Sequence, residues 1–147
     1  MQISIALAVG TGGFLGALLR FYVSDVITRT VGDEQAFLGT MTVNLAGCLL
    51  IGCLAVIVAR TTHLSPHAQR LLITGLLGSL TTFSTFALDS VNLLQQGRVA
   101  AAILNVSGNI VLGFLLVVVG IRVTGMMLGP GTDSGSSTGE SQAVTDQ

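Results

Sequence analysis

Four long apolar segments divide the chain, and each is close to the length that a bilayer requires. The first runs from Ile3 to Tyr22 or somewhat beyond, the second from Phe37 to Ala59, the third from Leu71 to Leu88 and the fourth from Val99 to Ile121. A helix needs about 20 apolar residues to cross a hydrocarbon core of roughly 30 Å. The pattern predicts an all-α integral membrane protein with four transmembrane helices.

The composition changes after the fourth segment. From Gly129 to Gln147 the chain consists mainly of Gly, Ser, Thr and acidic residues. Such a segment buries too little apolar surface to offset the entropy lost on folding. We therefore expect two parts, a four-helix transmembrane domain at residues 1–125 and a disordered polar tail at residues 126–147.

The third segment contains a polar run where a continuous apolar helix would be expected. Residues 81–86 read Thr-Thr-Phe-Ser-Thr-Phe, and they follow glycines at positions 75 and 78. Glycine lowers helix propensity, and hydrocarbon cannot satisfy the amides and carbonyls that a broken helix releases. We predict a broken third helix whose irregular backbone faces a protein-lined cavity or an ion path.

Three asparagines lie in the neighbouring segments without any accompanying charge. Asn44 is in the second segment, and Asn105 and Asn109 are one helical turn apart in the fourth. Single amides in a membrane usually form hydrogen bonds between helices. Several aligned amides and hydroxyls also suit a hydrated path for an anion, because they donate hydrogen bonds without carrying negative charge. The sequence leaves both interpretations open.

Two aromatic residues and one arginine have similarly divided interpretations. Phe83 and Phe86 would share a helical face, either as core residues or as ring edges that favour an anion. Arg20 is either an interfacial anchor for the first helix or a positive charge at the mouth of a vestibule. Asp89, one turn beyond Phe86, is in a position to pair with such an arginine.

Composition and charge exclude several classes of function. The chain is 50% hydrophobic and only 9% charged, which is typical of a multi-pass protein of the cell membrane. It has six arginines, no lysine and seven acidic residues. The arginines do not form a basic patch in the sequence, so no nucleic-acid partner is expected. The segments contain no Ser/Lys, His-Glu-x-x-His or paired-carboxylate arrangement, so we expect no enzyme. Cys48 and Cys53 are interpreted as packing residues.

The arginines near the segment ends give almost no orientation signal. Arg60, Arg70 and Arg122 fall on the side of the termini, and Arg29 and Arg98 fall on the other. A fixed orientation normally shows a clear cytoplasmic excess of basic residues. A flat count arises either from noise in a protein with few charges or from insertion in both orientations. Because four short spans can hardly enclose a pore, we also expect a homo-oligomer.

Three blocks of sequence resemble the signature blocks of the bacterial CrcB/Fluc fluoride channels. They are residues 12–21 (GGFLGALLRF), residues 39–47 (GTMTVNLAG) and residues 75–86 (GLLGSLTTFSTF). The resemblance spans about residues 3–122, with the three blocks in the same order and spacing. It implies a passive, fluoride-selective channel that exports cytoplasmic fluoride down its electrochemical gradient and so confers fluoride resistance.

The resemblance also implies an assembly, an ion and a set of site residues. The expected assembly is an antiparallel, dual-topology homodimer in the lipid bilayer. At its centre we expect a structural Na⁺ held by the backbone carbonyls of Gly78 and Thr81 from both copies. Arg20 matches a vestibule position, and the matched pore positions are Asn44, Phe83, Phe86, Ser84 and Thr82.

The chain departs from the family pattern at several positions. Ser79 stands where the family often has a second glycine, and Asp89 stands where it often has glutamate. Asn105 and Asn109 replace the tyrosine and serine of many members, and we include both in the expected fluoride path as polar residues of the fourth segment.

Two other functions remain as alternatives. A small dual-topology multidrug or cation exporter would share the size and the flat arginine count, but it needs a membrane-embedded carboxylate. The first segment has no acidic residue before Asp25. A non-conducting membrane scaffold is the second alternative, and it predicts no ion flux.

Overall fold

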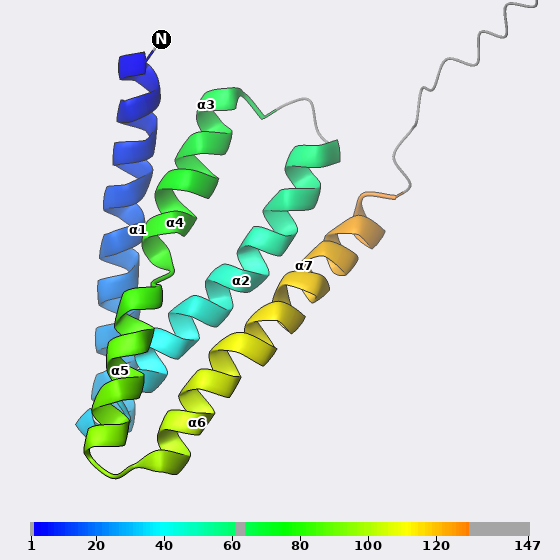
Figure 1. The fold of residues 1–147 in the computed structure, drawn as a ribbon. Helices are drawn as coiled ribbons and strands as arrows, with labels where there is room; N and C mark the ends of the chain where they lie inside the picture. The colour runs from blue at the N-terminus through cyan, green and yellow to red at the C-terminus, as the bar shows by residue number, and fades with distance from the viewer. Residues whose placement is uncertain (1, 61–63, 130–147) are drawn as a thin grey trace, which may run out of the picture.

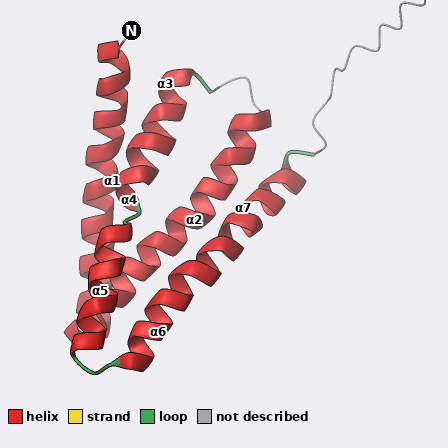
Figure 2. Cartoon of the chain, viewed as in Figure 1, coloured by secondary structure: helices red, strands yellow, loops and turns green. Residues whose placement is uncertain are grey.

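The computed structural model describes residues 2–60 and 64–129, and every regular element in these residues is helical. Four helical stretches are long and apolar enough to cross a membrane: Gln2–Val31, Phe37–Arg60, Pro66–Gln95 and Val99–Met127. Figures 1 and 2 show these stretches, of which the third is visibly interrupted near its middle. The predicted all-α membrane fold with four spans is therefore confirmed.

The four spans differ in regularity. The first two are single helices, α1 (Gln2–Val31) and α2 (Phe37–Arg60), linked by the short helix η1 (Asp33–Gln35). The third contains α3 (Pro66–Gln69), the π-helix η2 (Arg70–Leu77), α4 (Gly78–Leu80) and α5 (Phe83–Gln95). The fourth contains α6 (Val99–Ser107), the π-helix η3 (Gly108–Leu112) and α7 (Gly113–Met127).

Three spans are longer than the apolar runs that identified them. The helices α1, α5 and α7 continue into residues of mixed polarity, which hydropathy alone does not assign to a span. Helix α7 ends at Met127, two residues beyond the predicted domain boundary. Residues 130–147, most of the predicted tail, lie outside the described residues.

The spans are arranged as two pairs that diverge from a common end. Helix α1 lies beside η2 and α4 of the third span, and α2 lies beside α7 (Figure 1). The hairpin between α5 and α6 closes the narrow end, and its turn contains Gly97 with a positive φ of 72°. Both ends of the described chain lie at the opposite end, as an even number of spans requires.

Glycines allow the backbones of paired helices to approach closely. Gly12 and Gly16 are the buried residues of α1, and a Cβ on either would overlap a carbonyl oxygen of η2, at Leu71 or Leu76. Gly52 and Gly120 have the same role between α2 and α7. Gly12 and Gly16, four residues apart in the first span, therefore pack against the third span of the same chain.

Few apolar side chains are buried inside this single chain. One cluster joins Phe37, Leu93 and Ala102 near the α5–α6 hairpin, and a second joins Val43, Leu77 and Leu80 beside the middle of the third span. Most large apolar side chains of α1, α6 and α7 are exposed. Such an outer surface is stable in hydrocarbon or against another apolar surface.

We expect Gly12→Ala to destabilise the folded protein and Gly10→Ala to leave it intact. A methyl group at Gly12 meets backbone atoms of η2, which cannot move aside as a side chain can, whereas the space around Gly10 is open. Overpacking of this kind costs about 1–3 kcal/mol. Thermal unfolding in detergent, followed by size-exclusion chromatography, compares the two variants. Equal melting temperatures would contradict the tight contact between α1 and η2.

Candidate functional site

The third span leaves helical geometry at two residues close to its middle. Thr81 has φ −81° and ψ 147°, and Thr82 has φ −145° and ψ 119°, so both are extended. They are the sixteenth and seventeenth of the thirty residues in the span. Extended residues cannot continue the helical hydrogen-bond ladder, and at this depth hydrocarbon offers no substitute partners.

Two backbone amides at this point donate to side chains and not to helical carbonyls. The Thr82 amide, which a continuous helix would pair with the Gly78 carbonyl, donates to Asn44 Oδ1 at 2.8 Å. The Thr85 amide, the helical partner of the Thr81 carbonyl, donates to Thr82 Oγ1 at 3.3 Å. The carbonyl oxygens of Gly78 and Thr81 thereby lose their helical donors.

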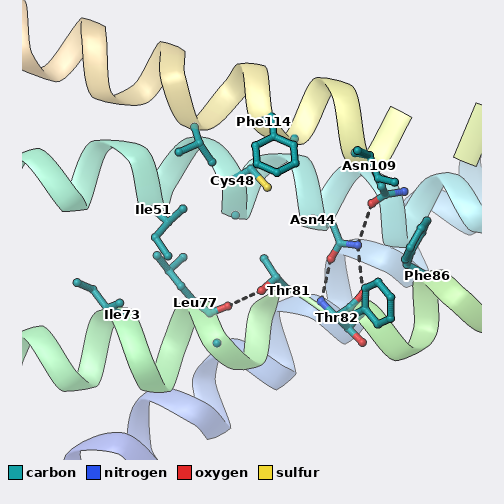
Figure 3. A pocket seen from close by; sticks show the side chains of 16 residues that line it. Asn44, Cys48, Ile51, Ile73, Leu77, Thr81, Thr82, Phe86, Asn109 and Phe114 are labelled. Atoms are coloured by element: carbon teal, nitrogen blue, oxygen red, sulfur yellow. Dashed lines mark hydrogen bonds between the residues drawn. The ribbon is translucent and has the colours of Figure 1, made fainter. Parts of the chain in front are cut away.

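Asn44 satisfies both backbone groups of Thr82 and extends the contact to the fourth span. Its Nδ2 donates to the Thr82 carbonyl at 3.2 Å and to Asn109 Oδ1 at 2.9 Å (Figure 3). Helix α2 is therefore hydrogen-bonded to the third and fourth spans through one carboxamide. Asn44 thus forms hydrogen bonds between helices, one of the two roles that the sequence left open.

The hydrogen bonds continue along the fourth span and return to the third. Asn109 Nδ2 donates to the Asn105 carbonyl and to Asn105 Oδ1, both at 2.9 Å. Asn105, whose exposed fraction is 0%, donates to Ser90 Oγ at 2.9 Å and to the Phe86 carbonyl at 3.3 Å. We call this set, Thr82, Asn44, Asn109, Asn105 and Ser90, the amide chain.

A cavity of about 480 Å³ lies between α2, the third span and the fourth span. Its lining includes Asn44, Asn109 and Thr82, together with Phe83 and Phe86, and no lining residue is ionisable except Cys48. Figure 3 shows apolar side chains such as Ile51 and Phe114 on one side of this space and the Asn44 hydrogen bonds at its end. The cavity thus offers dipoles and aromatic rings without a formal charge.

The two phenyl rings differ in their surroundings. Their centroids are 5.5 Å apart with a 59° angle between the ring planes, a tilted contact typical of aromatic pairs. Phe86 is buried, with 8% of its surface exposed, whereas Phe83 is 79% exposed. Within a single chain, only Phe86 therefore packs as a core residue, and Phe83 extends from the cavity wall.

Hydroxyl groups gather at the start of α5. Thr82 Oγ1 lies 3.2 Å from Ser84 Oγ and 3.1 Å from Thr85 Oγ1. Thr82 is the N-cap residue of the helix, so its hydroxyl stabilises the first turn while remaining next to Ser84. Of the five residues expected in the path, Asn44, Thr82, Phe83 and Phe86 line the cavity, and Ser84 lies beside Thr82 without lining it.

Arg20 and Asp89 lie apart from this group. Among the described residues the only ion pair joins Arg29 to Asp25 at 2.9 Å, so the predicted pairing of Arg20 with Asp89 is not formed. Asp89 lines a separate hollow of about 130 Å³ with Glu34 and Arg98, near the α5–α6 hairpin. Helix α1 carries Arg20 on a half-exposed position outside both spaces.

Ser90 joins the site although the sequence did not single it out. The Ser90 hydroxyl is buried, donates to the Phe86 carbonyl at 2.8 Å and accepts from Asn105. Its position one turn after Phe86 was a usable signal, because a serine there bonds readily to the carbonyl four residues earlier. Its contact with Asn105 could not be foreseen without the relative depth of the two spans.

The fold and the site define a class, a multi-pass membrane protein with an uncharged, largely apolar cavity that has amide and hydroxyl groups beside an extended segment in its third span. Comparison with known families identifies the family within this class. The family described as "CrcB-like protein, Camphor Resistance (CrcB)" matches residues 7–121. The chain belongs to the CrcB-like family, and the resemblance predicted from its three sequence blocks is confirmed.

Individual relatives are similar over most of their length. A fluoride-specific ion channel FluC from Sulfurovum sp. (strain NBC37-1) is 44% identical over 128 residues, covering 87% of this chain and 95% of that protein. A fluoride-specific ion channel FluC from Rhizobium leguminosarum bv. trifolii (strain WSM2304) is 39% identical over 118 residues, covering 80% and 94%.

Proposed function

We propose that this protein is a passive, fluoride-selective channel that exports cytoplasmic fluoride and so confers fluoride resistance. The observation that carries the proposal is the cavity next to Thr82, whose largely apolar lining includes amide, hydroxyl and aromatic groups but no carboxylate or basic residue. Such a lining donates hydrogen bonds to an anion without binding it as tightly as a basic side chain would. Membership of a family whose named relatives are fluoride-specific channels supports the same ion.

The energetics favour several weak contacts in series. Moving a carboxylate-sized ion from water to a medium of low dielectric costs on the order of 20 kcal/mol in the Born limit. One hydrogen bond to a charged group returns only about 1.5–3 kcal/mol. A path for fluoride therefore needs several donors and retained water. An inside-negative potential of 100 mV supplies about 2.3 kcal/mol per charge for export.

The residues around the cavity are assigned to this path. Thr82, Ser84 and Asn44 supply hydroxyl and amide groups, and the edges of Phe83 and Phe86 supply weakly positive C–H groups. Asn109 extends the polar wall along the fourth span, and Asn105, which does not line the cavity, holds Asn109 in place from behind. Arg20 is assigned to the vestibule, where a positive charge raises the local concentration of anions.

The assembly proposed for this function is an antiparallel homodimer in which the third span acts as a broken helix. Phe83 is 79% exposed and Phe114 is 74% exposed beside the cavity, so a second copy would cover apolar surface there. The flat distribution of arginines near the span ends fits a chain that inserts in both orientations.

A structural Na⁺ at the dimer centre is proposed on the fit of the backbone oxygens. The carbonyls of Gly78 and Thr81 have lost their helical donors to Asn44 and Thr82 Oγ1. Space is open around the Gly78 α-carbon, where a Cβ would approach only the Ile73 carbonyl oxygen, at 3.8 Å. Backbone carbonyls of interrupted helices are known ligands for Na⁺. Two oxygens from one chain are few for a hard cation, and a second copy would double them.

The rival functions make different demands on this site. A proton-coupled exporter of cationic substrates needs a carboxylate in its binding cavity, and the cavity beside Thr82 has none. A scaffold needs no path and predicts no flux. Fluoride efflux from liposomes containing the purified protein distinguishes both from a channel, since neither rival releases fluoride.

We expect Phe83→Leu and Phe86→Leu to reduce fluoride efflux strongly in protein that remains folded. An aliphatic group packs as well as a ring in many cores, but it has no positive edge to offer an anion. Asn44→Leu should act likewise by removing a donor. Efflux from liposomes is measured with a fluoride electrode and normalised to dimer by size-exclusion chromatography. Near-normal efflux in both phenylalanine variants would show that the two rings only pack and do not contact fluoride.

Removing Na⁺ should weaken the dimer and abolish efflux. Thr81→Ala should retain both properties, because the proposed ligand is the backbone carbonyl, whereas Thr81→Leu should disturb them. The Thr81 methyl group lies against Gly47, where a Cβ would overlap it, so a longer side chain directed the same way would meet α2. Dimer content and efflux are compared in Na⁺ and in N-methylglucamine buffers. Unchanged dimer content and efflux without Na⁺ would refute the structural ion.

A reporter fused to the C-terminus should be detected on both faces of the membrane. The expectation follows from an antiparallel dimer of identical chains, which requires each orientation in equal number. Paired reporters that are active only in the cytoplasm or only outside it provide the measurement. One orientation in cells that express only this chain would contradict the antiparallel assembly.

A further inference from the structure

Each carboxamide hydrogen of the amide chain has an acceptor within the protein. A carboxamide has two N–H donors, and the three asparagines direct theirs to six acceptors. Those of Asn44 point to the Thr82 carbonyl and Asn109 Oδ1. Those of Asn109 point to the carbonyl and Oδ1 of Asn105. Those of Asn105 point to Ser90 Oγ and the Phe86 carbonyl. No hydrogen of these amides is left over for an ion.

The members of the chain differ in their access to the cavity. Asn44 and Asn109 line it, whereas Asn105 is fully buried behind them. Both hydrogen bonds from Asn44 Nδ2 join cavity-lining residues, but only the one to Asn109 Oδ1 has a side-chain acceptor that can rotate away, since the Thr82 acceptor is a backbone carbonyl. To receive that hydrogen, fluoride must displace Asn109 Oδ1. Asn105 in turn fixes Asn109, because Asn109 Nδ2 donates to both the carbonyl and the Oδ1 of Asn105.

We propose that Asn109, held in place by Asn105, is a positioning residue that competes with fluoride for the Asn44 amide hydrogen and thereby weakens fluoride binding in the path. The inference rests on the proposed fluoride path and assigns Asn109 the role of an acceptor in it. A site that exchanges one hydrogen bond for another holds its ion less tightly than a site with an unpaired donor. Conduction requires this, since an ion that binds too tightly does not leave.

The competing interpretation, in which Asn109 donates to fluoride directly, predicts the opposite change on mutation. Loss of a direct donor raises the fluoride concentration that gives half-maximal efflux. Loss of a competing acceptor lowers that concentration and also slows maximal efflux, because the ion is released more slowly. The direction of the change therefore separates the two roles, and a general loss of stability changes the amount of active protein but not the half-saturating concentration.

Asn109→Ser is the principal test. The hydroxyls of Ser90 and Ser107 both donate to the carbonyl four residues earlier, so a serine at position 109 should bond to the Asn105 carbonyl and release the Asn44 hydrogen. The half-saturating fluoride concentration for efflux should fall about tenfold, which corresponds to roughly 1.4 kcal/mol. Asn109→Leu should cause the same fall if it folds. Ser107→Ala, on the same span but outside the amide chain, is the matched control and should leave the value unchanged.

The coupling to Asn44 is tested by fluoride binding to purified protein, measured by isothermal titration calorimetry, which does not depend on efflux. Asn109→Ser should tighten fluoride binding when Asn44 is present. It should have no further effect in the Asn44→Ser background, which lacks the Nδ2 hydrogen for which Asn109 and fluoride compete. An unchanged or raised half-saturating concentration, or an equal effect in both backgrounds, would overturn the inference. Normal efflux in Asn44→Leu would remove the proposed path itself, and with it this role of Asn109.

Discussion

The hydrogen bonds between the Thr82 backbone and the Asn44 carboxamide are the interaction on which the rest of the site depends. Two extended residues in the middle of a span leave an amide and a carbonyl that lipid cannot satisfy. A carboxamide offers one acceptor and two donors, so it meets both groups of Thr82 and still has a hydrogen for Asn109. The contact requires α2 to lie close to the third span. Gly47, one turn after Asn44, permits this because any side chain there would overlap the Thr81 methyl group.

The same arrangement explains how a polar site exists at this depth without a charge. An ionised side chain in the bilayer interior is costly and binds a counter-ion tightly. Carboxamides and hydroxyls that satisfy one another avoid the cost of unpaired polar groups and remain able to exchange partners. Ser90 and Asn105 both donate hydrogen bonds to the Phe86 carbonyl, and Asn105 also donates to the Ser90 hydroxyl, so these polar groups are paired as well. A path built in this way favours passage over binding, which is the requirement that the proposed channel function imposes.

The parts of this structure that sequence alone predicted are those that depend on local composition. Apolar length identified the four spans, and the run from Thr81 to Phe86 marked the point at which helical geometry is lost. The ends of α1, α5 and α7 were missed because helices continue past the apolar residues that reveal them. Which asparagines meet depends on the rotation and depth of each span, which are set by glycine contacts such as that between Gly52 and the Val117 carbonyl. The absent pairing of Arg20 with Asp89 has the same origin, since facing positions on different helices have no local signal.

The proposed assembly and the proposed cation rest on one physical feature of the chain, its interrupted third span. The buried apolar clusters of the chain are small, and the ring of Phe83 projects from a cavity wall with most of its surface uncovered. The amides that a continuous helix would pair with the Gly78 and Thr81 carbonyls donate to side chains instead. Two carbonyls without their helical donors are costly at this depth, because hydrocarbon offers no substitute donor, whereas the exposed ring is tolerated by lipid or by another apolar surface. A second copy and a cation would satisfy both at once, so the amide chain that redirects the Thr82 backbone also prepares the surface on which assembly is proposed.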